Sequence, residues 1–540
     1  MNRGRRTMNQ LQLAVLVSVL LLAGGTPGVA VPSSASPSAE ATASIKGLRK
    51  AAANRQRRIL VNNNGGAVTQ RLTSPTAKAI LDDDATQLIG SHVDTILYCT
   101  KSSGFGLFTH FTKVGQVFTS RDDIFANNRM EDLLAAKIDP LQVMVDFSKQ
   151  HGIEVFWSMR MNDTHDGSRT SYGPGLLRAN RLKMEHPEYL IGTADKRPKH
   201  GAWTAVDYAR PEIRDLAFRY FEEVCRNYEV DGIELDFSRH PVFFKSTSRG
   251  QPATDDDRNM MTDLVRRIRT MADEVGQQRR RPILIAMRVP DSVEYSRAIG
   301  LDLEQWLADD LLDLLIVTSY FQLNEWDYSV KLARKHGVKI YPSLDDSRAG
   351  DESGKQLRTT PLAYRGRAAE AWASGADGVY LYNAPAPDSS IWRELGDSQV
   401  LSKLDKDYFA SVRGAIGSAG GNLPIQPYLN IETLNPKNPK PLTPGKTAVA
   451  RINIGEEYAK SDPVKLTLRL RFDSPFSEKL LSATFNGEQI QLAPAALGWL
   501  EAVVPNDVVQ KGANRVELTS LQNAAEKSLS WTDCLLEVRH

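Results

Sequence analysis

Eight short apolar runs, separated by helical patterns, constrain the fold of this 540-residue chain more than any other feature. They are continuously apolar and rich in β-branched residues, which is typical of strands covered on both faces. Eight such strands alternating with helices predict an α/β fold, the (β/α)8 or TIM barrel. The runs occupy residues 58–62, 93–100, 153–160, 231–237, 282–289, 312–320, 338–343 and 377–382.

The helical pattern between the runs is clearest in residues 211–228, where apolar side chains recur at three- and four-residue steps. This spacing predicts a helix with one buried face. A doubly wound open sheet is the alternative architecture. The barrel is favoured because eight strands fit into roughly 330 residues and because no glycine-rich phosphate loop follows the first strand.

The pattern changes after about residue 405, where helical periodicity fades. Short runs at 465–472, 499–504 and 515–521 alternate with Gly, Asn and Pro turns, which predicts an all-β, jelly-roll-like sandwich. The expected organisation is therefore a barrel over residues 58–405, a linker over 406–424 and a β-sandwich accessory domain over 425–540.

The N-terminus has the pattern of an export signal. Arg3, Arg5 and Arg6 precede the apolar run 11–23, and small residues follow up to Ala30. This indicates a secretory signal peptide over residues 1–30, followed by a flexible linker over 31–57 rich in Ser, Ala and Pro. We expect a periplasmic or extracellular protein that keeps no stable membrane anchor after cleavage.

Composition narrows the possible partners. The chain has 67 Lys and Arg against 65 Asp and Glu, a net charge of +2, which gives no electrostatic basis for binding nucleic acid. The three cysteines are widely spaced, so they predict burial as small apolar side chains and no disulfide framework. No zinc-ligand spacing is visible, and neither a metal nor another cofactor is expected.

The most informative segment is residues 231–241, which read DGIELDFSRHP. Strand alternation places Glu234 and Asp236 on the same face. If that face is the barrel interior, Asp236 emerges at the C-terminal mouth, where barrel enzymes keep their catalytic groups. Arg239 could pair with it, and a purely structural ion pair at the rim is the alternative.

This segment resembles the fourth strand of the glycosyl-hydrolase-like family 10 domain, which reads D-G-I-x-x-D followed by R-x-P. Membership would imply an exported barrel that hydrolyses glycosidic bonds in a polysaccharide. Compared with family 18 chitinases, Ser238 stands where those enzymes have a catalytic Glu, so their acetamido-assisted mechanism is not expected. The matching residues are Asp231, Gly232, Ile233, Asp236, Arg239 and Pro241.

Glycoside hydrolysis ordinarily needs two carboxyl groups. Asp236 is our prediction for one. The second is left open among Asp163, Glu325 and Asp345, which follow the third, sixth and seventh predicted strands. Glu325 is preferred as the proton donor because Trp326 beside it would desolvate the carboxyl. Each of the three acids could instead cap a helix or a turn.

A sugar-binding site combines aromatic surfaces with fixed polar groups. The predicted mouth offers both, although Trp157 lies within its strand and could serve packing alone. The predicted substrate-binding residues are Arg160, Asn162, His165, Trp203, Glu234, Arg239, Tyr320, Gln322, Asp345, Tyr382 and Asn383.

The sequence thus predicts a glycoside hydrolase that acts on an extracellular or cell-wall polysaccharide. The alternative is a non-catalytic, carbohydrate-binding barrel that lacks a complete acid pair. A metal-dependent deacetylase or phosphoesterase is disfavoured, because the nine histidines are scattered along the chain.

Overall fold

The computed structural model describes residues 37–100, 104–167, 173–318, 321–344, 352–382, 388–412, 423–475, 477–496, 498–521 and 529–540. The predicted signal peptide, residues 1–30, lies outside the described residues, as do the site candidates Tyr320, Asp345 and Asn383. Among the described helices, none is both long and apolar enough to cross a membrane.

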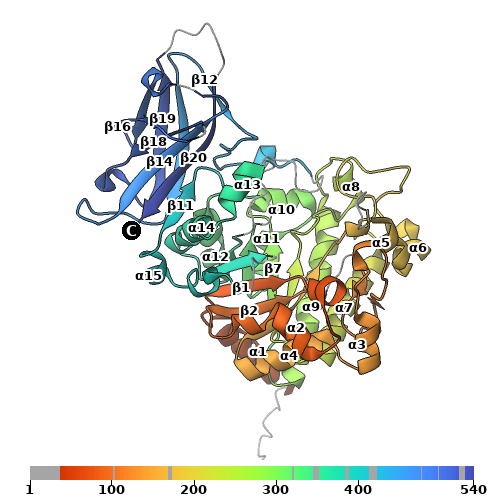
Figure 1. The fold of residues 1–540 in the computed structure, drawn as a ribbon. Coiled ribbons are helices and arrows are strands. Elements are labelled where there is room, and N and C mark those ends of the chain that lie inside the picture. Colours follow the sequence, from red (N-terminus) through yellow and green to blue (C-terminus); the bar gives the residue numbers. More distant parts are fainter. Residues whose placement is uncertain are drawn as a thin grey trace, which may run out of the picture.

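The larger domain is the predicted (β/α)8 barrel (Figure 1). Its strands are all parallel and pair in the order β10-β1-β2-β5-β6-β7-β8-β9. A parallel bridge between Ser343 and Tyr380 joins the last strand to the first and closes the sheet, so the open-sheet alternative is wrong. The strands are β1 (Ile59–Asn63), β2 (Val93–Tyr98), β5 (Glu154–Arg160), β6 (Gly232–Asp236), β7 (Leu284–Val289), β8 (Leu314–Val317), β9 (Lys339–Pro342) and β10 (Val379–Tyr382).

Helices surround the barrel and cover its outer face with apolar side chains. Local signals set their ends: Thr254 and Asp257 form a capping box at the start of α9, and Gly152 ends α4 with φ 68. The helices are α2 (Ala77–Asp84), α3 (Met130–Ala136), α4 (Pro140–His151), α5 (Gly173–Ala179), α6 (Arg181–Glu185), α7 (Pro211–Asn227), α8 (Lys245–Ser248), α9 (Asp255–Gln278), α10 (Val293–Ile299), α11 (Leu303–Ala308), α12 (Trp326–Lys335), α13 (Glu352–Arg358), α14 (Pro361–Ala373) and α15 (Ser398–Leu401).

The predicted flexible linker over 31–57 is wrong for most of its length, because α1 (Pro37–Ala53) is helical and contacts α9. The buried Arg49 side chain pairs with Asp313 at 3.2 Å and with Asp273 at 3.3 Å. These acids are more than 200 residues away in the chain. Long-range ion pairs and packing stabilise this helix, so the local Ser- and Ala-rich composition could not predict it.

The C-terminal domain is the predicted β-sandwich, with two antiparallel sheets enclosing a separate apolar core. One sheet has the order β11-β20-β14-β18-β17, with β12 also on β20, and the other β13-β19-β15-β16. All three cysteines of the chain are buried, as predicted. The strands are β11 (Lys406–Phe409), β12 (Lys440–Leu442), β13 (Thr447–Ile454), β14 (Lys465–Phe472), β15 (Leu481–Phe485), β16 (Glu488–Ile490), β17 (Ala493–Pro494), β18 (Trp499–Val503), β19 (Gly512–Ser520) and β20 (Leu529–Arg539).

The predicted linker over 406–424 needs correction at its start, because residues 406–409 form β11 and pair antiparallel with β20. The partner strand lies at the far end of the chain, so local sequence could not reveal the pairing. Strand β11 lies beside α14 of the barrel (Figure 1). A Cβ atom added at Gly366 of α14 would lie 2.2 Å from the carbonyl oxygen of Asp407. The two domains are therefore in direct backbone contact.

A buried ion pair also joins the domains. The Arg358 guanidinium at the end of α13 donates to both carboxylate oxygens of Asp533 on β20, at 2.9 and 2.7 Å. Neither side chain is exposed. A charge left alone in such a place is costly, because both groups have lost their hydration.

We predict that Asp533→Asn lowers the free energy of unfolding by about 3–5 kcal/mol, because it leaves the Arg358 charge buried without its partner. Chemical denaturation followed by circular dichroism measures the change. Asp507→Asn is the matched control, because Asp507 pairs with a mostly exposed Lys460 at 3.8 Å; its cost should stay below about 1 kcal/mol. Equal costs for both variants would contradict the prediction.

Candidate functional site

Three neighbouring strands place charged side chains inside the barrel in two layers. The register across β5, β6 and β7 aligns Ser158, Glu234 and Ala286 in a lower layer. It aligns Arg160, Asp236 and Arg288 one step nearer the C-terminal mouth. The predicted alternation of Glu234 and Asp236 onto one face therefore corresponds to two successive layers.

Glu234 lies in the lower layer and is fully buried. Its carboxyl accepts hydrogen bonds from Asn62 Nδ2 at 2.8 Å, from the Tyr380 hydroxyl at 2.9 Å and from Ser158. Burial and the nearby charge of Asp236 raise the pKa of Glu234 to about 7. Side chains of the barrel interior therefore hold both of its carboxyl oxygens. Substrate binding by Glu234 stays a prediction.

Asp236 occupies the upper layer at the end of β6, as predicted. Its Oδ1 accepts the backbone N–H groups of Ser238 at 2.9 Å and Arg239 at 3.1 Å. Its Oδ2 pairs with the Arg288 guanidinium at 3.3 Å. The Arg288 guanidinium lies 3.9 Å from the ring centre of Tyr382, which places this predicted site residue in the same layer. Arg239 thus contacts Asp236 through its backbone rather than through the ion pair that the sequence suggested.

Asp163 belongs to a hydrogen-bonded chain beside this layer. Its Oδ2 accepts from Arg160 Nη1 at 2.8 Å, and its Oδ1 is 2.7 Å from His165 Nδ1. His165 Nε2 lies 2.7 Å from Arg239 Nη2. The predicted residues Arg160 and His165 therefore contact Asp163 directly, and Arg239 reaches it through His165. The backbone N–H of Arg239 connects this chain to Asp236.

These contacts define the protonation states. A guanidinium can only donate, so His165 Nε2 must accept and Nδ1 must carry the proton that it donates to Asp163. Burial and the charges of Arg239 and Arg160 lower the pKa of His165, which agrees with a neutral ring. Burial alone would raise the pKa of Asp163, but His165 and Arg160 outweigh it and hold this pKa well below its usual range. Asp163 is therefore unsuited to donate a proton.

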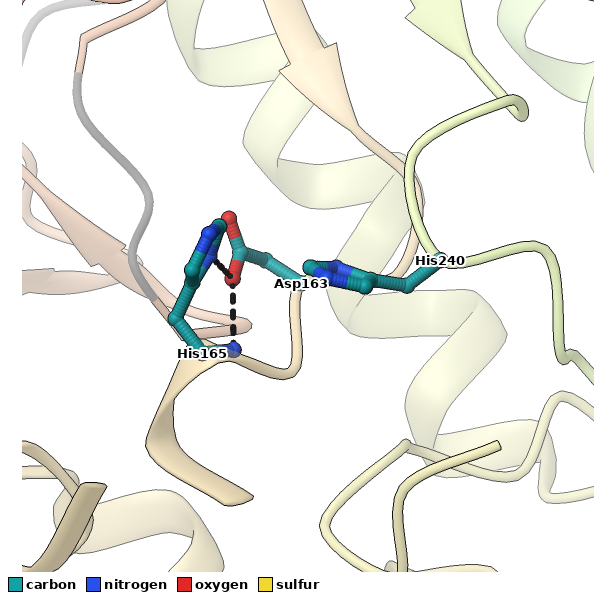
Figure 2. Close-up of side chains that lie close together, drawn as sticks. All are labelled: Asp163, His165 and His240. Atoms are coloured by element: carbon teal, nitrogen blue, oxygen red, sulfur yellow. Dashed lines mark hydrogen bonds and ion pairs between the residues drawn. The ribbon is translucent and has the colours of Figure 1, made fainter. Parts of the chain in front are cut away.

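His240 adds a third potential metal ligand to Asp163 and His165 (Figure 2). Their ligand atoms lie within 4.8 Å of one another. However, both ring nitrogens of His165 are hydrogen-bonded, and the guanidiniums of Arg160 and Arg239 hold Asp163 and His165. His240 Nδ1 accepts the Thr164 N–H at 3.3 Å. Two guanidiniums this close disfavour a cation, so the arrangement fits a hydrogen-bonded network better than a metal centre.

Glu325 is not part of this site, and the preference for it as proton donor is corrected. It immediately precedes α12 where the barrel meets the sandwich domain, and its carboxyl accepts a hydrogen bond from Asn453 of β13 rather than from the helix. It lines a cavity of about 440 Å³ together with Trp326, Glu370 and Lys511. Burial and the charge of Asp327 do raise the pKa of Glu325, to about 7, but at a different place from Asp236.

The side chain of Asn162 is fully engaged by the backbone around it, and its predicted contact with substrate stays a prediction. It is fully buried, and its Nδ2 donates to the carbonyls of Val206 at 3.0 Å and Val242 at 2.6 Å. Its Oδ1 accepts the Val206 N–H at 3.2 Å. Every one of these contacts ties together backbone segments around the mouth. A sugar hydroxyl would have to displace them.

The remaining aromatic and amide candidates differ in position. Trp157 is buried in the outer packing layer, and its indole N–H donates to Thr100 at 2.9 Å, so it serves packing. Trp203 is half-buried against the barrel core. Gln322 Nε2 donates to the Asn324 carbonyl at 3.0 Å. Sugar contacts by Trp203 and Gln322 stay predictions.

The sequence analysis missed Arg288, His240 and Tyr380. Arg288 had a visible signal, because it is the one charged residue in the otherwise apolar run 282–289. A charged side chain on a buried strand needs a partner of opposite charge, because its burial is otherwise costly. His240 and Tyr380 carried no such signal, since a histidine in a loop and a tyrosine in a strand are both common.

Comparisons with known proteins leave the family of this chain open. No protein-family profile matches the sequence. An S-layer-related protein of Niallia circulans is 30% identical over 111 residues, which covers 19% of this chain and 7% of that protein.

Three of the similar solved structures are a glycoside hydrolase domain and two α-L-fucosidases. The α-L-fucosidase isoenzyme 2 of Paenibacillus thiaminolyticus has a TM-score of 0.41 at 16% identity; the match covers 64% of this chain and 49% of that one, about half its length. The glycoside hydrolase domain of PgaB from Bordetella bronchiseptica has a TM-score of 0.41 at 11% identity, over 64% of this chain and 99% of that one. An α-L-fucosidase of Bacteroides thetaiotaomicron has a TM-score of 0.35 at 11% identity, over 89% and 96%.

We predict that stability depends on pH through Glu234. Its pKa rises from an ordinary 4.5 to about 7, so the folded protein retains a proton that the unfolded chain releases between these values. The stabilising contribution is complete below about pH 4.5 and is lost as the pH rises to about 7. Relative to Glu234→Gln, the wild type should lose roughly 3 kcal/mol over this window, at about 1.4 kcal/mol per pKa unit.

Denaturant melts of both proteins at several pH values measure this difference. Glu488→Gln, at an exposed position on β16, controls for the removal of a carboxylate elsewhere. A constant difference between wild type and Glu234→Gln across the window would mean that Glu234 is ionised in the folded protein.

Proposed function

We propose that this protein is a glycoside hydrolase whose reaction takes place at the C-terminal mouth of the barrel, with Asp236 as the central carboxylate. Its substrate would be an extracellular or cell-wall polysaccharide. The observation that carries the proposal is the setting of Asp236, which ends a buried strand and is held by two backbone N–H groups and by Arg288.

This setting suits a nucleophile or a base more than an acid. N–H groups and a guanidinium favour the charged form of a carboxylate and fix its direction. A positioned carboxylate of this kind can attack the anomeric carbon or activate a water molecule. Glu234 lies in the layer below it, where burial raises the pKa of Glu234 to about 7.

The proton donor is assigned by elimination to Asp345. Among the three acids that the sequence offered, Asp163 is held ionised by Arg160 and His165. Glu325 faces the sandwich domain. Asp345 follows β9 in the chain and lies outside the described residues, so its part in the reaction is a proposal from sequence position alone.

Export is part of the proposal and is supported by the sequence of residues 1–30, where arginines precede an apolar run and small residues follow it. A polysaccharide substrate outside the cytoplasm is consistent with that address.

We predict that Asp236→Asn lowers the rate of glycan hydrolysis by about 10²- to 10⁴-fold while the fold is retained, because an amide can neither attack nor accept a proton. The assay measures reducing ends released from a polysaccharide panel that includes peptidoglycan glycan strands, and circular dichroism checks the fold. Asp345→Asn should cause a comparable loss. Glu325→Gln, at the domain seam, should retain the wild-type rate.

Two outcomes would change the assignment. Hydrolysis that survives in Asp236→Asn would place the reaction elsewhere in the molecule. Glycan binding by a wild type that releases no reducing ends would favour the non-catalytic, carbohydrate-binding barrel.

A further inference from the structure

The buried arginines of this protein differ in how fully their donors are used. Arg57 is fully buried, and its guanidinium makes hydrogen bonds to both oxygens of Glu154 and to three backbone carbonyls. Arg358 likewise bonds both oxygens of Asp533 and two carbonyls. Saturation of this kind is what burial of a guanidinium normally requires.

Arg160 does not follow this pattern. Only 3% of the residue is exposed, yet within the described part of the chain its guanidinium makes a single hydrogen bond, from Nη1 to Asp163 Oδ2 at 2.8 Å. Its Nε is buried and has no hydrogen-bond partner among the described residues. Asp163 is moreover shared with His165. The guanidinium therefore keeps donors available at a place where an unmet donor is costly.

The position of Arg160 links this feature to the site. Arg160 and Arg288 flank Asp236 on the two adjacent strands, at the same level of the barrel. A sugar ring that reaches Asp236 must therefore lie close to Arg160. The two flanking guanidiniums also offset the repulsion that Asp236 would exert on a negatively charged ring.

We propose that the substrate is an acidic saccharide, and that Arg160 binds the carboxylate of the sugar ring that contacts Asp236. A planar carboxylate matches the paired N–H groups of a guanidinium, which makes a uronic acid the fitting class. The inference rests on the proposed function for the location of the substrate, and it adds a substrate class and a residue that determines specificity.

The direct test compares ligands that differ only in charge. Calorimetry or ligand-observed NMR measures the binding of sodium glucuronate, glucuronamide and glucose to the wild-type protein at neutral pH. Charge-assisted hydrogen bonds should make glucuronate bind roughly 10- to 100-fold more tightly than glucuronamide. Equal affinities would overturn the proposal and would mean that water satisfies the donors of Arg160.

Variants assign the effect to Arg160. In Arg160→Gln the preference for glucuronate over glucuronamide should fall to about threefold or less. Arg160→Lys keeps the charge but loses the paired N–H groups, so its preference should be smaller than that of the wild type and larger than that of Arg160→Gln. Arg267→Gln is the matched control, because Arg267 lies on α9 and pairs with Asp215 at the surface. Thermal melts check folding, and the wild-type comparison of ligands needs no variant. An unchanged preference in folded Arg160→Gln would overturn the assignment.

The same experiments separate this inference from the proposed hydrolysis. Hydrolysis of neutral glycans that depends on Asp236, without any preference for glucuronate, would contradict the assignment of an acidic substrate and leave the proposed hydrolysis intact. Binding of glucuronate that depends on Arg160, without hydrolysis of any glycan by the wild type, would leave the inference standing and remove the enzyme assignment.

Discussion

Two carboxyl groups on one buried strand set the requirements that the rest of the barrel interior meets. Glu234 and Asp236 have no exposed surface, so each must be neutral or compensated. Three side chains donate hydrogen bonds to Glu234, and its pKa is raised. Asp236 accepts hydrogen bonds from two backbone N–H groups and pairs with Arg288. Strands β1, β5, β7 and β10 all contribute side chains to this compensation. The site is therefore a property of the closed barrel rather than of one loop.

The seam between the domains shows how acids with similar sequence signals acquire different roles. Glu325 and Asp163 both follow barrel strands, and the neighbouring tryptophan made Glu325 the better candidate for a raised pKa. The pKa of Glu325 is indeed raised, yet it is the sandwich domain that buries this carboxyl, through Asn453. Asp163 instead accepts hydrogen bonds from Arg160 and His165, which hold its pKa well below the usual range. A raised pKa caused by desolvation is therefore not enough to identify a catalytic acid. The position of the carboxyl relative to the other charged groups must also be known.

Part of the candidate site could be read from the sequence because strand geometry is local. Alternation put Glu234 and Asp236 on one face, and a strand end in a parallel barrel put Asp236 at the mouth. The partners of these acids could not be read in this way. Arg288 reaches Asp236 from 52 residues away, and Arg239 reaches His165 across 74. Their pairing depends on the register between strands, which the sequence of either strand does not specify.

The sequence by itself determined the eight barrel strands, the change to an all-β domain and the position of Asp236, because apolar periodicity and strand alternation act over a few residues. Only the tertiary structure decided that residues 37–53 form a packed helix, that β11 joins the sandwich and that Asn162 and Glu325 lie outside the layer of Asp236. These outcomes rest on Asp313, β20, Val242 and Asn453, each of them distant along the chain from the residues that it contacts. The physical reason is that burial and charge compensation are set by whichever groups the closed barrel and its sandwich bring together in space.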